Sequence, residues 1–192
     1  PIAFTGAQIE DKYKTNTKLF GKHNDENIMA SVRVAECLGI SKSIISYQLS
    51  TFKPLRHRME LVLSHSDRTI INDSKSTNPE ATIVALNSFD EKLILICCGE
   101  DKQLDLFDLA MIIISKVKHV IVFGDIAIPL KQEILKHSKD VSIFHVKSIE
   151  ESFTQAWDIS CAHDVILFSP CSSSLDQFKG FEDRGNRFVK CV

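Results

Sequence analysis

The sequence contains no apolar stretch long enough to cross a membrane and no strong excess of charge of either sign. Its longest apolar runs, Leu93 to Cys98 and Val165 to Phe168, have the length of strands, whereas a membrane-spanning helix needs about 20 apolar residues. The formal net charge of −2 provides no global field to attract nucleic acid or an anionic membrane. We therefore expect neither membrane insertion nor nucleic-acid binding, and the 44% hydrophobic fraction indicates a globular protein with a substantial core.

Paired cysteine motifs are also absent. The six cysteines, at positions 37, 97, 98, 161, 171 and 191, include no Cys-x-x-Cys pair. Cys97 and Cys98 are adjacent in an apolar segment, and successive side chains of a strand point to opposite faces, so these two thiols are poorly placed to pair. The pattern favours reduced, buried thiols in a cytoplasmic protein over disulfides or a zinc site, and we expect no metal-binding residue in this sequence.

Beyond residue 55 the sequence alternates between strand-like and helix-like segments. Several of the strand-like segments are continuously apolar, which is typical of strands buried on both faces of a parallel sheet. The pattern predicts a Rossmann-like three-layer α/β domain with a mostly parallel sheet. The expected strands are 59–63, 69–71, 93–98, 119–123, 141–146 and 164–168, and the expected helices are 79–87, 104–115, 126–137, 149–159 and a tail from Leu175.

The first 54 residues differ in character from the rest. Apolar residues at helical spacing predict helices over 28–38 and 43–49, and Gly39 ends the first of them. Pro54 cannot continue a helix, so we place a domain boundary there, between residues 1–54 and 55–192. Because the sequence begins with Pro1 and residues 1–18 show no core of their own, we expect the chain to be a piece of a longer protein.

Three polar loops follow expected strands, and their strands belong to one parallel sheet. The first runs from Asp73 to Asn78, the second from Gly99 to Lys102, and the third from Ser169 to Phe178. The carboxyl ends of parallel strands meet at one edge of the sheet, where open α/β domains bind ligands. We therefore expect an anion pocket lined by hydroxyls, with Lys75 and Lys102 as its cations and Asp73 as an acceptor for ligand donors.

Two of these loops carry helix-start signals. Asn78 is a favourable N-cap and Pro79 suits the first position of a helix. Ser174 and Gln177 have the Ser-x-x-Gln spacing of a capping box, which predicts that the third loop presents hydroxyls and free backbone N–H groups at a helix N-terminus. Each feature alone is compatible with an ordinary capped turn or a solvated lysine, and the coincidence of three such loops favours a site.

Five segments form a recognisable set: Gly21 to Ala30, His57 to Glu60, Asn72 to Asn78, Ser169 to Phe178 and Phe181 to Gly185. Taken together and in this order, they cover nearly the whole chain and resemble the Mur ligases of peptidoglycan synthesis, in particular the branch that adds D-glutamate. An Asp-Asn-Pro-Arg motif, expected of the branch that adds diaminopimelate or lysine, is absent.

The resemblance implies a three-domain ligase, of which residues 1–54 are the end of the central ATP-binding domain and residues 55–192 the C-terminal, amino-acid-binding domain. The central domain's phosphate loop, Gly-x-x-Gly-Lys-[Ser/Thr], does not occur here, so the fragment is expected to be inactive alone. By resemblance, ATP phosphorylates the carboxylate of UDP-N-acetylmuramoyl-L-alanine, and the amine of D-glutamate attacks the acyl phosphate. Mg²⁺ is an expected cofactor whose ligands lie mainly outside this sequence, and a cytoplasmic monomer is expected.

Site residues are also implied by the resemblance. Positions expected to bind ATP are Asn24, Asn27, Arg58 and Asp73, with the two asparagines near the adenine, Arg58 at the phosphates and Asp73 at the ribose. Lys75 is expected to be catalytic. The positions expected around D-glutamate are Lys75, Thr77, Lys102, Ser174, Leu175 and Phe181.

Two departures from the family pattern occur, and two other functions stay open. Cys98 stands where the family usually has glycine, and Ser172 and Ser173 replace common alanines. One alternative is another glutamate-adding ligase similar to folylpolyglutamate synthetase, although its motifs are not recognisable here. The other is a non-catalytic, Rossmann-like nucleotide-binding module, for which the Gly-x-Gly-x-x-Gly fingerprint is absent.

Overall fold

The computed structural model describes residues 19, 22–65 and 67–192. The chain divides into two compact units, with the division between Leu55 and Arg56. Each unit is described by itself.

The first unit contains a pair of helices, α2 (Lys22–Cys37) and α3 (Lys42–Thr51). Ile28, Met29 and Val32 lie on one face of α2 and are buried with Ile45 of α3. Gly39 takes a left-handed φ of 76°, and its N–H donates to the carbonyl of Glu36, which ends α2 as its sequence indicates. Both expected helices are confirmed, although α2 begins six residues earlier than the apolar pattern indicates.

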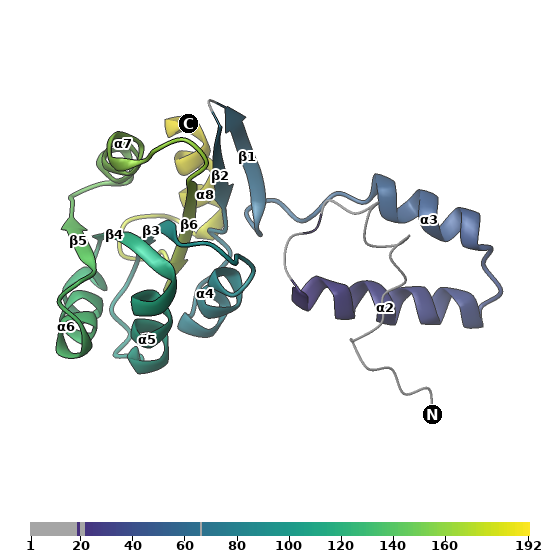
Figure 1. Cartoon of the computed structure of the whole chain (residues 1–192), viewed down its shortest axis with the longest axis horizontal. Coiled ribbons are helices and arrows are strands. Elements are labelled where there is room, and N and C mark those ends of the chain that lie inside the picture. The colour runs from purple at the N-terminus through teal and green to yellow at the C-terminus, as the bar shows by residue number, and fades with distance from the viewer. Residues whose placement is uncertain (1–18, 20–21, 66) are drawn as a thin grey trace. The chain divides into compact units, whose positions relative to one another are not determined.

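The second unit is built on a six-stranded sheet with the order β1-β2-β6-β3-β4-β5 (Figure 1). Its strands are β1 (Glu60–His65), β2 (Arg68–Asn72), β3 (Leu93–Cys98), β4 (Val117–Phe123), β5 (Ser142–His145) and β6 (Val165–Cys171). β1 pairs antiparallel with β2, and the other pairs are parallel. All six residues of β3 are buried, as expected of a central strand that lacks polar alternation.

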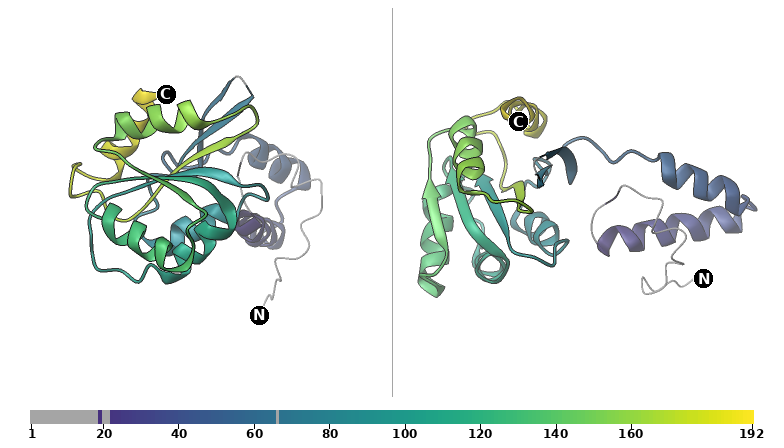
Figure 2. Two further views of the ribbon diagram at one scale, coloured as in Figure 1. Left: turned by 60° about the vertical axis from the view of Figure 1, so that its left-hand side comes forward. Right: turned by 45° about the horizontal axis from the view of Figure 1, so that its top comes forward.

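Helices cover both faces of this sheet (Figures 1 and 2). On one face lie α7 (Ile149–Ile159) and α8 (Phe181–Cys191), which pack against each other. On the other lie α4 (Pro79–Leu86), α5 (Phe107–Lys116) and α6 (Ala127–His137). Phe188 of α8 stacks on Phe168 of β6 with ring centroids 4.3 Å apart. The expected three-layer α/β domain with a mostly parallel sheet is therefore confirmed.

The tail of the chain differs from its sequence-based prediction. No helix begins at Ser174; the segment from Ser174 to Phe178 is a turn, and α8 begins at Phe181 after the N-cap Gly180. The Ser174 carbonyl accepts the N–H groups of Gln177 and Phe178. Phe178 is 8% exposed and belongs to the core between the sheet, α7 and α8. We infer that this burial stops the helix, because a continuous helix would compete with placing that ring in the core.

The strand order explains why the polar loops meet. β6 lies between β2 and β3 and is parallel to both, so the loops after these three strands leave the sheet at the same edge. The loop after β4 joins them there, since β4 is the parallel neighbour of β3. Within the described residues, no helix is both long and apolar enough to cross a membrane.

Candidate functional site

Direct hydrogen bonds hold the loops after β2 and β3 to the end of β6 and to the loop that follows it. β6 continues to Cys171, and near its end the Phe168 carbonyl accepts the Asp73 N–H at 2.7 Å while the Ser169 hydroxyl donates to Asp73 Oδ2 at 2.9 Å. The Glu100 N–H donates to the Ser173 carbonyl at 3.0 Å. The expected convergence of the three loops is therefore confirmed, and the residues they carry share one edge of the domain.

Two glycines allow the loop backbones to approach so closely. Gly99 has a φ of +124°, and a Cβ there would lie less than 3.0 Å from the carbonyl oxygen of Ser173. Gly124, with a φ of +74°, has equally little room beside Asp176 Oδ2 and packs against the backbone of Gly99. At Gly99 a side chain is excluded by the Ser173 backbone as well as by the left-handed φ. At Gly124 the left-handed φ disfavours a side chain, and the Asp176 carboxylate would have to move to admit one.

A fully buried arginine lies beneath the loops. Arg184 of α8 is 0% exposed, and its Nη1 donates to the Ser172 carbonyl at 3.0 Å. Its Nε and Nη2 donate to the Oγ and the carbonyl of Ser74, at 3.1 and 3.0 Å. Nη1 also lies 3.9 Å from the sulfur of Cys98. One side chain thus joins the loops after β2 and β6 and the end of β3.

Sequence reasoning missed Arg184, although two signals were available. The residue lies in the Phe-Glu-Asp-Arg-Gly segment that carried the family resemblance, where no role was assigned to it. It also lies between Phe181 and Phe188 at i+3 and i+7, the spacing of one helix face. An arginine on an otherwise apolar, buried face needs hydrogen-bond partners.

Asp73 is part of the framework of the first loop. Its side chain is 3% exposed and accepts from the Met59 N–H at 3.1 Å and from the hydroxyls of Ser76 and Ser169 at 2.5 and 2.9 Å. Burial raises the pKa of the Asp73 carboxyl, while these donors act in the opposite direction. In this conformation the carboxylate binds its own chain, and its contact with a ribose stays a prediction.

Lys75 and Phe181 lie together. The Lys75 Nζ is 4.6 Å from the centroid of the Phe181 ring, within the range of a cation–π contact. The Ser74 hydroxyl donates to the Phe181 carbonyl at 2.8 Å, which fixes the start of α8 against the first loop. Thr77, in the same loop, is half-buried like Lys75. Lys75 and Phe181 are therefore in contact, and Thr77 lies two residues after Lys75 on the same loop.

The third loop presents fewer hydroxyls than expected. The Ser172 hydroxyl donates to the Glu100 carbonyl and the Ser173 hydroxyl to Glu100 Oε2, both at 2.6 Å. The expected capping box at Ser174 is wrong, because the helix begins only at Phe181. Ser174 itself is 3% exposed, and its backbone carbonyl accepts the N–H groups of Gln177 and Phe178.

The remaining two D-glutamate positions are open to solvent. Leu175 is 68% exposed, in the turn that follows Ser174. Lys102 is exposed, in the loop between β3 and α5. The structure thus brings Lys75 and Phe181 together, with Thr77 on the same loop as Lys75, and places Lys102, Ser174 and Leu175 on the two adjacent loops.

The segment that follows the division between the units is bonded to the first loop. His57 and Met59 both have left-handed φ values, 62° and 45°. The His57 carbonyl accepts the Lys75 N–H at 2.9 Å. Nδ1 of the His57 ring lies 2.9 Å from Asn72 Nδ2. Arg58 lies between these two anchored residues and is exposed, so its backbone is fixed while its guanidinium faces solvent.

His57 is a second residue without a sequence-based role. It is 2% exposed, and burial lowers its pKa, with the opposing effect of Glu60 second in size. A Cβ at Gly185 would lie less than 3.0 Å from the His57 ring. The ring therefore fills the space that glycine leaves in α8 and fastens this segment to the helix.

The two expected adenine-binding asparagines lie in the first unit. Asn24 and Asn27 belong to the first two turns of α2, and Asn27 Nδ2 donates to Asn24 Oδ1 at 3.3 Å. Their contact with a nucleotide stays a prediction.

Three of the cysteines are buried in the central strands β3 and β6. All six are free thiols, and Cys97, Cys98 and Cys171 are buried. Burial raises the pKa of Cys98 to about 12 and raises that of Cys97. Thiolates are the reactive form, so these buried thiols are inert.

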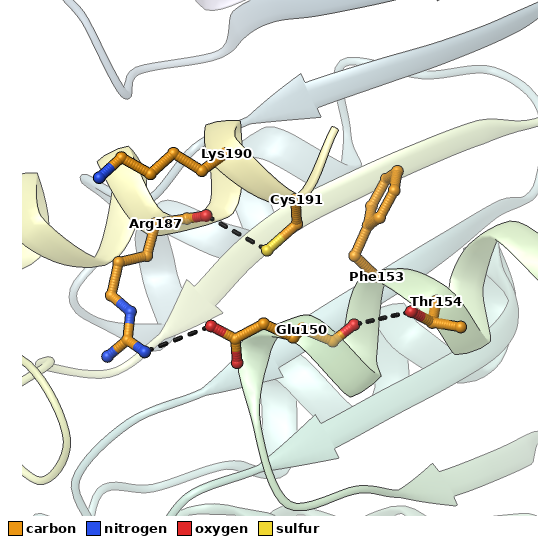
Figure 3. Close-up of a pocket in the computed structure, with 6 residues that line it drawn as sticks. All are labelled: Glu150, Phe153, Thr154, Arg187, Lys190 and Cys191. Atoms are coloured by element: carbon orange, nitrogen blue, oxygen red, sulfur yellow. Dashed lines mark hydrogen bonds and ion pairs between the residues drawn. The ribbon is translucent and has the colours of Figure 1, made fainter.

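Two further features of the described residues bear on ligands. No group of three or more His, Cys, Asp or Glu side chains among them is arranged to hold a metal ion. A cavity of about 310 Å³ lies between α7 and α8, lined by Glu150, Phe153, Thr154, Arg187, Lys190 and Cys191 (Figure 3). None of the expected site residues lines it.

Sequence comparison finds similarity to one ligase family. The family profile described as "Mur ligase, glutamate ligase domain" matches residues 57–171. The UDP-N-acetylmuramoylalanine--D-glutamate ligase of Lactobacillus johnsonii is 38% identical over 179 residues, which are 93% of this chain and 38% of that protein. The chain thus spans well under half the length of this relative.

Solved structures with the same fold include several ligases of Thermotoga maritima. The UDP-N-acetylmuramate-alanine ligase aligns with a TM-score of 0.66 at 18% identity, over 91% of this chain and 38% of that one. A MurF ligase in complex with ADP aligns with a TM-score of 0.62 at 18% identity, over 90% and 38%. A folylpolyglutamate synthase aligns with a TM-score of 0.57 at 20% identity, over 81% and 37%. At these identities the likeness shows the fold alone.

Proposed function

Because this chain belongs to the Mur ligase family, we propose that it is the D-glutamate-binding part of a ligase that adds D-glutamate to UDP-N-acetylmuramoyl-L-alanine. The family is enzymatic, and two of the motifs that suggested it, His57 to Glu60 and Asn72 to Asn78, lie within the matched residues 57–171. The observation that carries the finer assignment is the 38% identity to a UDP-N-acetylmuramoylalanine--D-glutamate ligase over 93% of the chain.

The arrangement of the loops supports binding of a small dicarboxylic amino acid. Lys75, with Thr77 beside it, provides a cation and a hydroxyl on the first loop, and Lys102 provides a cation on the second. Ser174 adds a hydroxyl from the third loop. Two separate cationic groups suit the two carboxylates of glutamate, since charge-assisted hydrogen bonds are the strongest available to a carboxylate.

The reaction we propose forms an amide in two steps. ATP transfers its γ-phosphoryl group to the carboxylate of UDP-N-acetylmuramoyl-L-alanine, giving an acyl phosphate and ADP. The uncharged amine of D-glutamate then attacks the acyl carbon, and phosphate leaves as the amide forms. In this proposal Lys75 is the catalytic residue of the chain, because its ammonium would offset negative charge that develops as phosphate leaves.

ATP is proposed to bind at the four positions that the family resemblance implies. Arg58 would reach the phosphates with its exposed guanidinium, Asn24 and Asn27 would lie near the adenine, and Asp73 near the ribose. Mg²⁺ is proposed to accompany ATP, with ligands outside the described residues. A cytoplasmic location accords with the free thiols and, like a monomeric state, stays a prediction.

The test is product formation by the full-length protein. We expect a D-glutamate-dependent release of phosphate in the presence of ATP, Mg²⁺ and UDP-N-acetylmuramoyl-L-alanine, and a product whose mass equals the sum of the nucleotide substrate and glutamate less one water. L-glutamate, L-lysine and diaminopimelate serve as matched amino acids. Turnover with one of these and not with D-glutamate would refute the assignment.

The two alternatives give different outcomes in the same assay. A folylpolyglutamate synthetase-like enzyme would use L-glutamate with a reduced folate and ignore the muramoyl substrate. A non-catalytic nucleotide-binding module would bind NAD or ATP in calorimetry without releasing phosphate under any substrate combination.

A further inference from the structure

We propose that Arg184 is a positioning residue for amino-acid binding: it fixes the separation between the loop that carries Lys75 and the loop that carries Ser174. This inference rests on the proposed function, since it assigns those two loops to D-glutamate. It adds a residue that does not itself reach the substrate.

The geometry singles out Arg184 as the link between the loops. Its Nε and Nη2 bind the Oγ and carbonyl of Ser74, the residue immediately before Lys75. Its Nη1 binds the carbonyl of Ser172, two residues before Ser174. The guanidinium is planar and its donors have fixed directions, so the three bonds set a single distance between the two backbones.

The charge of Arg184 makes this link stronger than a neutral one. Within the described part of the chain, no carboxylate forms an ion pair with Arg184. Its hydrogen-bond acceptors are neutral: the oxygens of Ser74 and Ser172 and, at 3.9 Å, the sulfur of Cys98. A cation at 0% exposure is retained only when its donors are bonded. Hydrogen bonds to a charged group are stronger than neutral ones, and any movement of either loop would leave a buried donor without a partner.

The same cation also extends the positive field of the site. Arg184 is bonded to Ser74, the residue before Lys75, and its charge acts across a buried region of low effective dielectric. Glu100, by contrast, is bonded to the Ser173 hydroxyl. A dicarboxylate bound above these loops would be attracted by Arg184 without touching it.

The proposal predicts an effect on the amino acid rather than on the nucleotide. Of the positions assigned to ATP, Arg58, Asn24 and Asn27 do not lie on the loops that Arg184 joins. Asp73 lies on the first of these loops, but its carboxylate is held by Met59, Ser76 and Ser169 and not by Arg184. Loss of the guanidinium should therefore loosen the D-glutamate site while leaving the ATP site in place.

The experiment is steady-state kinetics of Arg184→Met in the full-length ligase, with D-glutamate and ATP varied separately. We expect the KM for D-glutamate to rise by about tenfold or more, the loss expected when bonds to a charged group are removed, and the KM for ATP to change less than about twofold. Arg184→Lys should give a similar rise, because one ammonium cannot span both loops. An unchanged KM for D-glutamate, an equal rise for ATP, or rescue by lysine would overturn the proposal.

Arg187 provides the matched control. It lies three residues further along α8, is exposed, and pairs with Glu150 at 3.2 Å (Figure 3). Arg187→Met should leave both KM values within about twofold of wild type, since exposed ion pairs contribute little. A rise for D-glutamate as large as that of Arg184→Met would show a general effect of helix charge and overturn the positioning role.

A second variant decides the question if Arg184→Met does not fold. Ser74→Ala removes one acceptor of Arg184 and keeps the charge, so it should raise the KM for D-glutamate in the same direction by a smaller factor. Unchanged kinetics in Ser74→Ala would then refute the proposal. Failure of the wild-type enzyme to use D-glutamate at all would instead refute the proposed function, which keeps the two ideas distinguishable.

Discussion

Replacement of Gly99 by alanine tests the close approach of the loops after β3 and β6. The new Cβ would lie less than 3.0 Å from the Ser173 carbonyl oxygen and 3.2 Å from Arg184 Nη1, and the backbone has a φ of +124°. Strain at such a φ costs about 1–3 kcal/mol, and an added methyl in a packed site costs about 1–3 kcal/mol. We therefore expect Gly99→Ala to lower the free energy of unfolding by about 2–6 kcal/mol.

Urea unfolding followed by tryptophan fluorescence measures this loss. The chain has one tryptophan, Trp157 in α7, with the Arg68 guanidinium 4.4 Å from its ring centroid. The signal therefore reports on the second unit. With an m-value of about 2 kcal/mol per molar urea, a loss of about 4 kcal/mol lowers the midpoint by about 2 M.

Gly180 is the matched control, because its φ of 167° is extended and a Cβ there would meet only Glu182 Oε2 at an ordinary 3.5 Å. Gly180→Ala should leave the midpoint nearly unchanged. A Gly99→Ala midpoint as close to wild type as that of Gly180→Ala would show that the Ser173 carbonyl does not lie against Gly99, and the account of the loop junction would be wrong.

Two further predictions concern titration and thiol reactivity. Burial lowers the pKa of His57 below its ordinary value of 6.5, so its contribution to stability is complete above that value and is lost as the pH falls below it. His57→Asn, which tolerates the left-handed backbone, should therefore flatten the decline in urea midpoint between about pH 7.5 and about pH 5.5; an equally steep decline would contradict a buried, neutral ring. Thiol labelling of the native chain should modify Cys37 and Cys161 rapidly and Cys191 more slowly, whereas Cys97, Cys98 and Cys171 should react only in denaturant. Rapid modification of Cys171 would contradict its burial.

The sequence was sufficient to predict the sheet and its helices, because the apolar pattern follows from burial on two faces. β3 is continuously apolar and lies at the centre of the sheet, and Asn78 caps α4 through its bond to the Ala81 N–H at 2.8 Å, as its position before Pro79 indicates. The helices, the strands and the N-cap depend on local sequence patterns. The convergence of the loops follows from a general rule, that the carboxyl ends of parallel strands meet at one edge of a sheet.

The interior of the site could not be predicted in the same way. The capping box at Ser174 failed because the burial of Phe178, a tertiary effect, interrupts the segment before a helix can form. The hydroxyls of Ser172 and Ser173 bond to Glu100. Glu100 lies on the loop after β3, more than 70 residues earlier in the chain, so these bonds could not be predicted from the local sequence. Arg184 and His57 acquire their roles only from contacts between distant segments.

The most direct test of the central claim is the D-glutamate dependence of Lys75→Ala in the full-length ligase, with the KM for ATP measured on the same preparation as an internal reference. If the loops after β2, β3 and β6 bind a dicarboxylic amino acid, the KM for D-glutamate should rise at least tenfold, as expected when a charge-assisted bond is lost, or turnover should cease while ATP still binds. Normal D-glutamate kinetics in this variant would contradict the assignment of these loops to the amino acid.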